Sequence, residues 1–400
     1  METSSLSSSD GRPESPSGSS APSSPLPSGS EPAANPLLAP PALLDQIPPF
    51  LPPVLPAPVQ PPPPPPAPFV FHGRAAEYFR IWIVNTLLTL LTGGIFLAWA
   101  KVRKRRYLRG NTELLGHRFD YRANPRGLLV GNIIVLLFFL GYAFLGSLYR
   151  PVQLSAIGLG ILLLPWIVVR SLSFNAHNTV YRGLRFRFHP SLSGAAKIYL
   201  FKPLLIPLSL GIYYPAWVRE RRRYTVQGHR LGDAYFHQET STGQFYATYL
   251  LGGLIIAGLV GVASLYLVGM VAWQKTGQLP LAWMIPYFIL YGFGLFLGRQ
   301  FIFAQMFNHL WNHTRLDEHR FVARMELGKW IGLQLTNLGA ILITAGMLYP
   351  WAVIRSHRYT ASCLGLHVQG TLDTIENMGR SQGNAAGDSA AEFIGVDFGL

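Results

Sequence analysis

Cysteine and charge are both scarce in this sequence. The chain of 400 residues contains one cysteine, Cys363, so it can form no internal disulfide and its redox compartment is not indicated. Charged residues make up 13% of the sequence, about half the share found in ordinary soluble domains. The N-terminus lacks a basic stretch followed by an apolar core, so we predict no cleaved signal peptide and expect insertion through internal segments.

Sequence signatures of catalysis are also missing. The sequence has no P-loop, dinucleotide fingerprint, nucleophile elbow or pair of catalytic acids, so we expect no enzymatic activity and no cofactor. His309 and His313 would share a helix face, where a metal could take His319 or His177 as a third ligand. The other interpretation is a helix end whose histidines meet water or headgroups. No cysteine or acid has matching spacing, so we expect no metal.

Long apolar runs account for the shortage of charge. Most of them reach the roughly 20 residues that a helix needs to cross the hydrocarbon core of a bilayer. A soluble helical core would instead show amphipathic segments. We therefore predict an all-α polytopic membrane protein. The apolar runs are Ile81–Ala98, Leu128–Leu148, Val152–Val169, Ile198–Val218, Tyr246–Trp273, Leu281–Ala304 and Trp330–Ile354.

The positive charge is concentrated in the middle of the chain. The whole sequence carries a net charge of +14, but both ends are acidic, and residues 69–372 hold 31 of the 33 Lys and Arg residues. A basic chain often binds nucleic acid. Here the cations lie beside apolar runs, which favours anchoring at an anionic leaflet. We expect membrane lipids with anionic headgroups as partners and no nucleic acid, and the oligomeric state stays open.

One motif occurs three times, as Gly94–Tyr107, Gly211–Tyr224 and Gly346–Tyr359. Each copy begins with glycine, passes a tryptophan and ends in a cationic cluster closed by Arg-Tyr. Such self-similarity indicates a fold built from repeated units. We predict three pseudo-repeats, at about residues 69–183, 184–315 and 316–370, within a membrane domain of residues 69–370.

Both ends of the chain have the composition of disordered tails. Residues 1–68 are rich first in serine and then in proline, and the proline-rich part could bind a protein partner. Residues 371–400 form a shorter, acidic tail. Short alternating pieces within the membrane domain, such as Phe69–Gly73, Leu115–Arg122 and Leu184–Phe188, predict small cytoplasmic β-strands.

Two membrane topologies fit these segments. In the first, only Leu128–Val169 and Tyr246–Ala304 cross fully, as two hairpins, and the three motif segments enter the membrane and return. This arrangement places the basic clusters, the strands and both termini on the cytoplasmic side. It also lets the strands before and after each motif segment pair with each other. In the second topology all seven segments cross, because the motif segments are long enough.

Eight side chains are candidates for contact with lipid or a solute. Arginine binds phosphate in a bidentate manner, and tyrosine suits the membrane interface; the alternative for both is plain topological anchoring. Lys202 lies inside an apolar run, where snorkelling to the interface competes with a functional role. The candidates are Arg106, Tyr107, Arg223, Tyr224, Arg358, Tyr359, Lys202 and Arg299.

The recurring features resemble the YjgN-like family of bacterial inner-membrane proteins. These features are Phe-x-Phe-x-Gly, Gly-Ile-x-x-x-Trp, Arg-Arg-Tyr, Asn-Thr and Gly-x-x-Phe, and the resemblance covers about residues 69–370. It implies a multi-pass protein of the cytoplasmic membrane with no assigned biochemical role. Ala98 departs from the proline of the other two motif copies, and Asn111-Thr112 has no clear counterpart after them.

The sequence supports two functional hypotheses. Repeats and broken helices are typical of transporters, which favours transport of a small solute or lipid. The alternative is a non-enzymatic membrane scaffold or envelope-organising protein, which the tails and the absence of acids from the apolar runs favour.

Overall fold

The computed structural model of the chain describes residues 65–148, 150–189, 191–273 and 281–369. The described residues belong to one compact unit of the chain. The N-terminal tail predicted at residues 1–68 lies outside the described residues except for its last four, and the C-terminal tail predicted at residues 371–400 lies wholly outside them.

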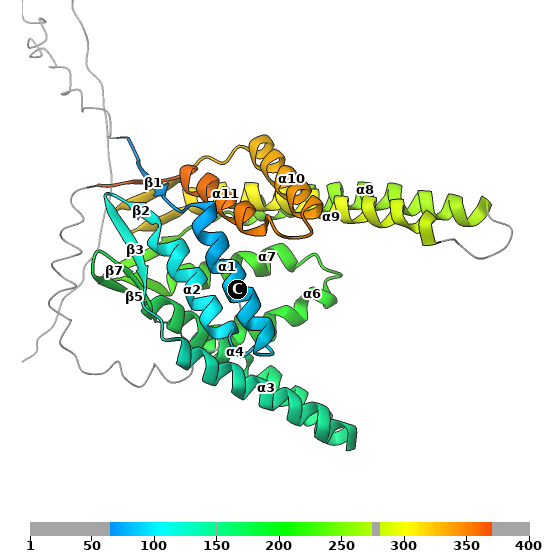
Figure 1. Ribbon diagram of the computed structural model, residues 1–400, viewed down its shortest axis with the longest axis horizontal. Coiled ribbons are helices and arrows are strands. Elements are labelled where there is room, and N and C mark those ends of the chain that lie inside the picture. The colour runs from blue at the N-terminus through cyan, green and yellow to red at the C-terminus, as the bar shows by residue number, and fades with distance from the viewer. Residues whose placement is uncertain (1–64, 149, 190, 274–280, 370–400) are drawn as a thin grey trace, which may run out of the picture. The chain divides into compact units, whose positions relative to one another are not determined.

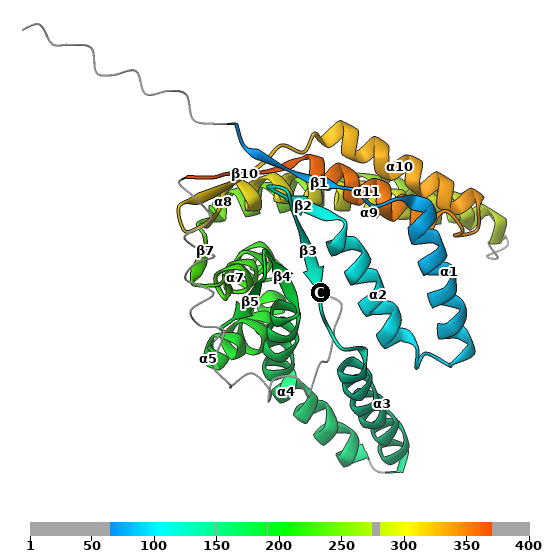
Figure 2. The same ribbon diagram turned by 60° about the vertical axis from the view of Figure 1, so that its left-hand side comes forward.

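Ten short strands, counted over the described ranges, pair antiparallel and close into a barrel (Figures 1 and 2). Each strand pairs with its neighbours along the chain, and β1 pairs with β10 to close the ring. The strands are β1 (Ala67–Phe71), β2 (Thr112–Leu114), β3 (His117–Tyr121), β4 (Thr179–Tyr181), β5 (Leu184–Phe188), β6 (His229–Leu231), β7 (Ala234–Gln238), β8 (Thr314–Leu316), β9 (His319–Ala323) and β10 (Leu364–His367).

Aromatic side chains fill the inside of the barrel. Each odd-numbered strand contributes one phenylalanine, and four neighbouring pairs of these rings have centroids 6.2 to 6.4 Å apart. Each even-numbered strand adds a buried leucine or tyrosine to the same cluster. These described strands therefore enclose a packed core and leave no open lumen. The phenylalanines are Phe69, Phe119, Phe186, Phe236 and Phe321.

Five helical segments alternate with pairs of strands in the part of the chain that the structure describes. Two are long hairpins, α3 (Pro125–Leu148) with α4 (Arg150–His177) and α8 (Thr242–Trp273) with α9 (Leu281–Asn312). Two are short hairpins, α1 (Ala75–Leu91) with α2 (Leu97–Gly110) and α10 (Leu327–Ile343) with α11 (Tyr349–Ser362). In Figure 1 the α8–α9 hairpin extends well beyond the neighbouring α10–α11 hairpin.

The remaining segment is a short hairpin with an irregular first arm. It runs through α5 (Leu192–Ala196), the π-helix η1 (Lys197–Phe201), the 3-10 helix η2 (Lys202–Leu204) and α6 (Leu205–Leu208), and returns as α7 (Tyr214–Gln227). Pro203 and Pro207 interrupt the α-helical ladder of hydrogen bonds in this arm, since proline has no amide hydrogen.

The three short hairpins turn at the glycine that opens each sequence motif. Gly94, Gly211 and Gly346 have φ of 94°, 88° and 90°, and each amide donates to the carbonyl five residues earlier at 2.7 to 2.8 Å. The residue before each glycine is also left-handed. The residue two positions before each glycine carries a hydroxyl, which accepts a hydrogen bond from the amide of the residue just before the returning helix, at 2.9 to 3.1 Å. The accepting residues are Thr92, Ser209 and Thr344. One sequence motif thus encodes one turn geometry three times.

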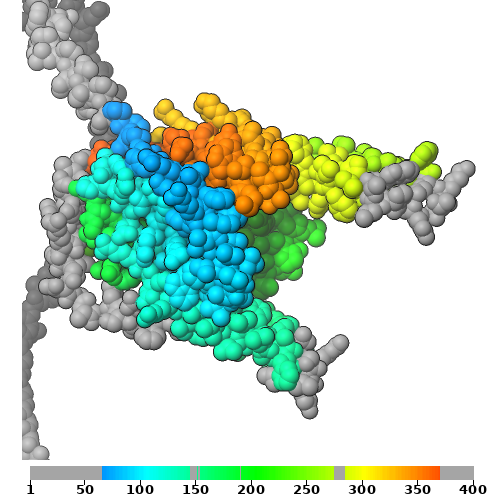
Figure 3. Space-filling view, in the orientation of Figure 1, coloured from blue at the N-terminus to red at the C-terminus, as the bar shows by residue number. Residues whose placement is uncertain are grey.

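The surfaces of the long hairpins and of the short-hairpin tips are apolar and exposed. Four helices among the described residues are long and apolar enough to cross a membrane, and at most 22% of each apolar window is buried by protein. At the tips, Leu90, Leu210 and Ile343 are 75%, 93% and 87% exposed. Side chains of this kind suit lipid and not water. Figure 3 shows the α1–α2 and α10–α11 hairpins side by side.

The prediction of an all-α fold with small β pieces is wrong, because the strands form one closed ten-stranded barrel. The expected strand positions are mostly correct, and the strands before and after each motif segment do pair, as β1 with β2, β5 with β6, and β9 with β10. The barrel cannot be recognised from the sequence because its strands are only three to five residues long, too short for a clear alternating pattern. Helical segments and strand pairs also alternate five times, where the motif alone suggests three units.

Candidate functional site

The three short hairpins share one geometry, which places their motif residues at fixed distances from the turn and from the barrel. Each turn glycine lies eighteen residues before the first residue of the following strand, as Gly94 before Thr112, Gly211 before His229 and Gly346 before Leu364. Residues at the same offset from the glycine therefore occupy equivalent places in all three hairpins. The eight candidate residues can be compared on this basis.

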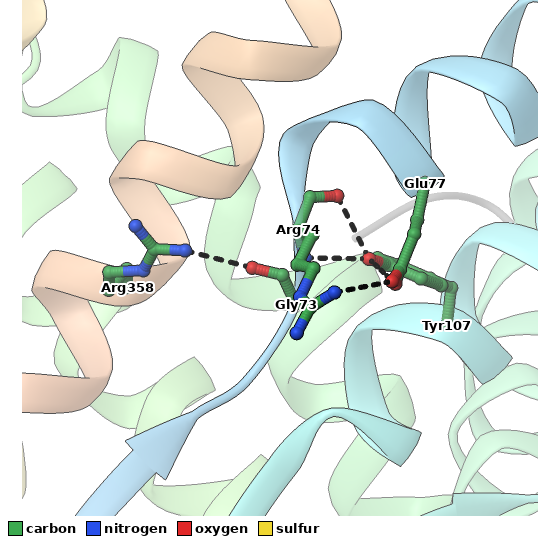
Figure 4. A network of polar contacts seen from close by, with 5 residues as sticks. All are labelled: Gly73, Arg74, Glu77, Tyr107 and Arg358. Carbon is green, nitrogen blue, oxygen red and sulfur yellow. Dashed lines mark hydrogen bonds and ion pairs between the residues drawn. The ribbon is translucent and has the colours of Figure 1, made fainter.

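The three motif tyrosines bind the backbone at the start of their own hairpin. The Tyr107 hydroxyl donates to Arg74 O at 3.0 Å and accepts from Arg74 N at 2.8 Å (Figure 4). Tyr224 donates to Ser191 O at 3.1 Å, and Tyr359 donates to Glu326 O at 3.2 Å. Burial is the main cause that raises the pKa of Tyr224 and of Tyr359 to about 12. Each hydroxyl thus joins the end of the returning helix to the beginning of the first helix by a hydrogen bond, which we call the tyrosine clasp.

Two of the motif arginines tie their helix to the end of a barrel strand. Arg106 Nε donates to Tyr121 O at 3.2 Å, and Arg358 Nη2 donates to Gly73 O at 3.0 Å (Figure 4). Arg223 Nε donates to Gln227 Oε1 at 3.3 Å, within its own helix. The Arg-Tyr pairs therefore make internal contacts at the junction between helices and barrel, and their contact with lipid stays a prediction.

Lys202 forms an ion pair with Glu220, with its Nζ 2.5 Å from Glu220 Oε2, and both side chains are about one third exposed. The Tyr213 hydroxyl donates to the same carboxylate oxygen at 3.2 Å. This pair lies nine residues before and nine residues after Gly211. Lys202 therefore has a partner inside the hairpin and does not depend on snorkelling to find one.

The other two short hairpins place neutral-cationic pairs at the same offsets. Nine residues on either side of Gly94, Arg103 Nη1 donates to Asn85 Oδ1 at 3.5 Å. Nine residues on either side of Gly346, Arg355 Nη1 donates to Asn337 Oδ1 at 3.3 Å. Each short hairpin thus carries one polar cross-link between its two arms, and only in the α5–α7 hairpin is the cation on the first arm.

Arg299 lines a cavity of about 560 Å³ between helices α2, α9, α10 and α11. We call this the lateral cavity and define it by Lys104, Phe296, Arg299, Gln300, Ile341 and His357. Lys104 and Arg299 form no hydrogen bond or ion pair with any other residue that the structure describes. Among the eight candidates, Arg299 is therefore the one whose charged group has no partner within the described chain and could bind a ligand.

A second cavity of about 460 Å³, the central chamber, lies where the ends of the returning helices meet the phenylalanine layer of the barrel. It is lined by Arg109, His229, His357, Phe119 and Trp311 among others. A side cavity of about 230 Å³ shares His229 and Trp311 with it. His357 lines both the central chamber and the lateral cavity, so the central chamber shares lining residues with each of the other two cavities.

The pKa values of two histidines along these cavities are lowered. Burial lowers the pKa of His229, and the Arg109 guanidinium adds to this, while a contact of 2.6 Å from its Nδ1 to Thr225 O opposes it. The pKa of His357 is also lowered, first by loss of water and then by the Lys104 ammonium. Surrounding cations therefore make the cavities electropositive without relying on charged histidines.

The histidines considered for metal binding lie outside these cavities. The rings of His309 and His313 have centroids 4.4 Å apart, and His313 Nδ1 lies 2.8 Å from His309 O. Across the described residues, no group of three or more His, Cys, Asp or Glu side chains lies close enough to hold a metal.

A comparison with protein families gives the chain its relatives. A family described as "Bacterial protein of unknown function (DUF898)" matches residues 66–393, which include the whole barrel and every helical segment described above. The chain belongs to this family. The resemblance inferred from the motif is therefore confirmed, and the match extends across most of the chain.

The related proteins of the DUF898 family found by sequence are membrane proteins. The chain is 27% identical to "Inner membrane protein YjgN" of Escherichia coli O157:H7 over 275 residues, covering 68% of this chain and 56% of that protein. It is 35% identical to the protein of the same name in Escherichia coli (strain K12) over 152 residues, covering 36% and 37% of the two chains. No solved structure matches the chain.

The match spans only about half the length of these curated relatives or less. Their names and the four apolar helices support a membrane protein and an inner-membrane location for this DUF898 member.

The polar cross-links and the lateral cavity were not found from the sequence. Arg103 and Glu220 lie inside the motif, nine residues after its glycine, but no local pattern links them to Asn85 and Lys202, nine residues before it. Lys104 lies within a run of Lys and Arg residues, and the sequence does not indicate which of them lines a cavity. Asn178-Thr179, at the start of β4 after the first long hairpin, matches Asn111-Thr112 at the start of β2, and both asparagines donate to the carbonyl four residues earlier.

Proposed function

We propose that the two long hairpins of this protein cross the inner membrane, while the three short hairpins enter it from the barrel side and return. Every helical segment in the described chain begins and ends at the barrel, so seven separate crossings would need strands on both membrane faces. From cross-link to turn glycine is nine residues, about 13 Å of helix, and half of a bilayer core is about 15 Å. This placement puts the basic clusters, the barrel and both termini in the cytoplasm.

Within this arrangement we propose a non-enzymatic role in the transport of a small solute or lipid. The observation that carries the proposal is the row of three adjoining cavities, which runs from between α9, α10 and α11 to the base of the barrel. Because phenylalanines fill the barrel, a route along the barrel axis is blocked. Access from the side, between helices that face lipid, fits the cavities better and favours an amphiphilic cargo.

A membrane scaffold is the second candidate. The packed barrel and the internal contacts of the Arg-Tyr pairs are what a rigid anchor for partner proteins would need. The lateral cavity and the central chamber also have only one of their lining residues in common, His357, which does not by itself make a route for a cargo.

Flux measurements separate these two functions. The purified full chain would be reconstituted in liposomes, and the movement of labelled phosphatidylglycerol and of small anions would be followed. Transport predicts a protein-dependent flux that His357→Trp, which fills the shared position, reduces at least about tenfold while Arg324→Gln leaves it unchanged. No flux for any probe, with folded protein in the membrane, would favour the scaffold.

The topology has its own test. With Cys363 replaced by serine, single cysteines at Thr112, Gln227 and Thr276 would be exposed in turn to an impermeant thiol reagent on intact cells. We expect labelling at Thr276 alone, because it lies in the link between the helices of the second long hairpin. Labelling at Gln227 without labelling at Thr112 would instead require all segments to cross.

A further inference from the structure

The lateral cavity combines unpaired positive charge with an apolar wall. Lys104 and Arg299, both exposed, line it from different helices, and His357 lies beside Lys104. Neither Lys104 nor Arg299 forms an ion pair or hydrogen bond with another described residue, and no acidic residue is among those that line the cavity. Such a cluster repels itself in the empty site and is stabilised when an anion enters.

The depth of Arg299 in the proposed membrane placement means that its charge needs an anionic partner. Arg299 lies fifteen residues before the first residue of β8, whereas the cross-linking Arg355 lies nine residues before β10. The difference of six residues corresponds to about 9 Å of helix, which places Arg299 nearer the middle of the membrane. It also lies within a helix long and apolar enough to cross a bilayer. An arginine at this depth is costly without a counter-charge, and such residues pair with one another, with carbonyls or with a ligand.

The remaining lining divides into a polar and an apolar part. Gln300 is 7% exposed and its Oε1 accepts from Trp330 Nε1 at 3.0 Å, which leaves its amide hydrogens for another acceptor. Phe296 and Ile341 line the same cavity with no polar atoms on their side chains. A volume of about 560 Å³ lies within the usual range for sites that bind small organic ligands. The cavity therefore offers charge to a headgroup and an apolar surface to a chain.

We propose that the lateral cavity binds the phosphate of an anionic phospholipid from the cytoplasmic leaflet, with Arg299 and Lys104 contacting the phosphate oxygens. The arginine fork can hold two of these oxygens at once, and Lys104, which lines the same cavity from another helix, supplies a second charge. The acyl chains lie along the side formed by Phe296 and Ile341, toward the exposed surface of α9. This inference rests on the proposed membrane placement but does not require that the protein transports anything.

Lipid retention measured by native mass spectrometry tests the site. The full chain, purified in detergent and stripped of lipid, would be titrated separately with phosphatidylglycerol, phosphatidylcholine and inorganic phosphate. We expect one tightly retained phosphatidylglycerol, weaker phosphatidylcholine and no competition by millimolar phosphate. The double variant Lys104→Gln/Arg299→Gln would weaken retention at least about tenfold, as loss of one good charged contact does. The matched variant Arg324→Gln removes an exposed cation from the same unit and would retain the lipid.

Three outcomes would overturn the inference. They are equal retention by the double variant, equal binding of phosphatidylcholine, and displacement by inorganic phosphate, which would indicate a site for free anions. Leu338→Trp fills the cavity without changing its charge and would also release the lipid, so it decides the question if the double variant does not fold. Flux in liposomes without lipid retention would refute the lipid site alone. Lipid retention without flux would refute only the proposed transport function.

Discussion

The polar cross-links of the three short hairpins predict that their residues can be exchanged. Lys202 and Glu220 occupy the places that Asn85 and Arg103 occupy in the first hairpin. The double substitution Lys202→Asn/Glu220→Arg would convert the ion pair into the neutral-cationic pair of the other hairpins. Since the turn and the distance to the strand are the same, we expect the double variant to fold and to keep most of its stability.

The single substitutions should be harmful. Lys202→Asn leaves the Glu220 carboxylate without its ion pair, and Glu220→Arg places two cations side by side. Breaking a fully buried pair costs about 3–5 kcal/mol and an exposed pair contributes about 0.2–1 kcal/mol. With both side chains about one third exposed, we expect about 2 kcal/mol for each single change. That corresponds to about 4–8 °C in melting temperature.

Thermal unfolding of the purified protein in detergent, followed by tryptophan fluorescence, measures the effect. The two singles, the double and the parent complete a double-mutant cycle. If the double variant keeps its stability, the favourable coupling approaches the sum of the two single losses, about 4 kcal/mol. If the double variant is as unstable as the sum of the two singles, the equivalence of the three hairpins is refuted. The variant Arg126→Gln, at an exposed cation at the start of α3, provides the baseline for loss of charge alone.

Three further predictions concern the turns, the tyrosine clasps and pH. Gly346→Ala should cost about 1–2 kcal/mol because φ there is 90°, whereas Gly339→Ala, in open space on α10, should stabilise by about 0.5–1 kcal/mol; melting temperatures of the pair compare them. Tyr224→Phe removes the bond to Ser191 O and should cost about 1 kcal/mol in the same assay, and an unchanged melting temperature would contradict the clasp. Because burial lowers the pKa of His229, the unfolded chain binds a proton at this histidine more readily than the folded chain does. The free energy of unfolding should therefore be highest above the ordinary histidine pKa of about 6.5 and fall as the pH drops below it. Thermal unfolding at about pH 5 to 8 measures this dependence, which His229→Gln should weaken.

The helical part of the fold could be predicted from sequence because long apolar runs and glycine turns are local signals. Gly94, Gly211 and Gly346 each mark a turn, and the structure has a turn at each. The barrel could not be predicted as a whole. Its strands are found by alternation, as at Leu184–Phe188, but their pairing joins residues such as Ala67 and Leu366, whose separation leaves no local pattern.

The site was predictable only in part. Arg299 was chosen as a charge within an apolar run, and the structure places it in a cavity. Lys202 was chosen for the same reason, yet the structure pairs it with Glu220, eighteen residues later and across a turn. What distinguishes a paired from an unpaired cation is the residue facing it across two helices. That information appears only when the hairpin register is known.

The way in which the ring of strands closes also has a consequence for biosynthesis. The strand that joins both ends of the sheet, β10, is encoded last within the domain, and its partner β1 is encoded first. During translation every earlier hairpin can enter the membrane while the sheet still has two free edges, and free edges invite pairing with other chains. The sheet can lose both free edges only after the ribosome has passed His367. Closure of the sheet is thus a late step in synthesis, and in the proposed topology it follows entry of the hairpins into the membrane.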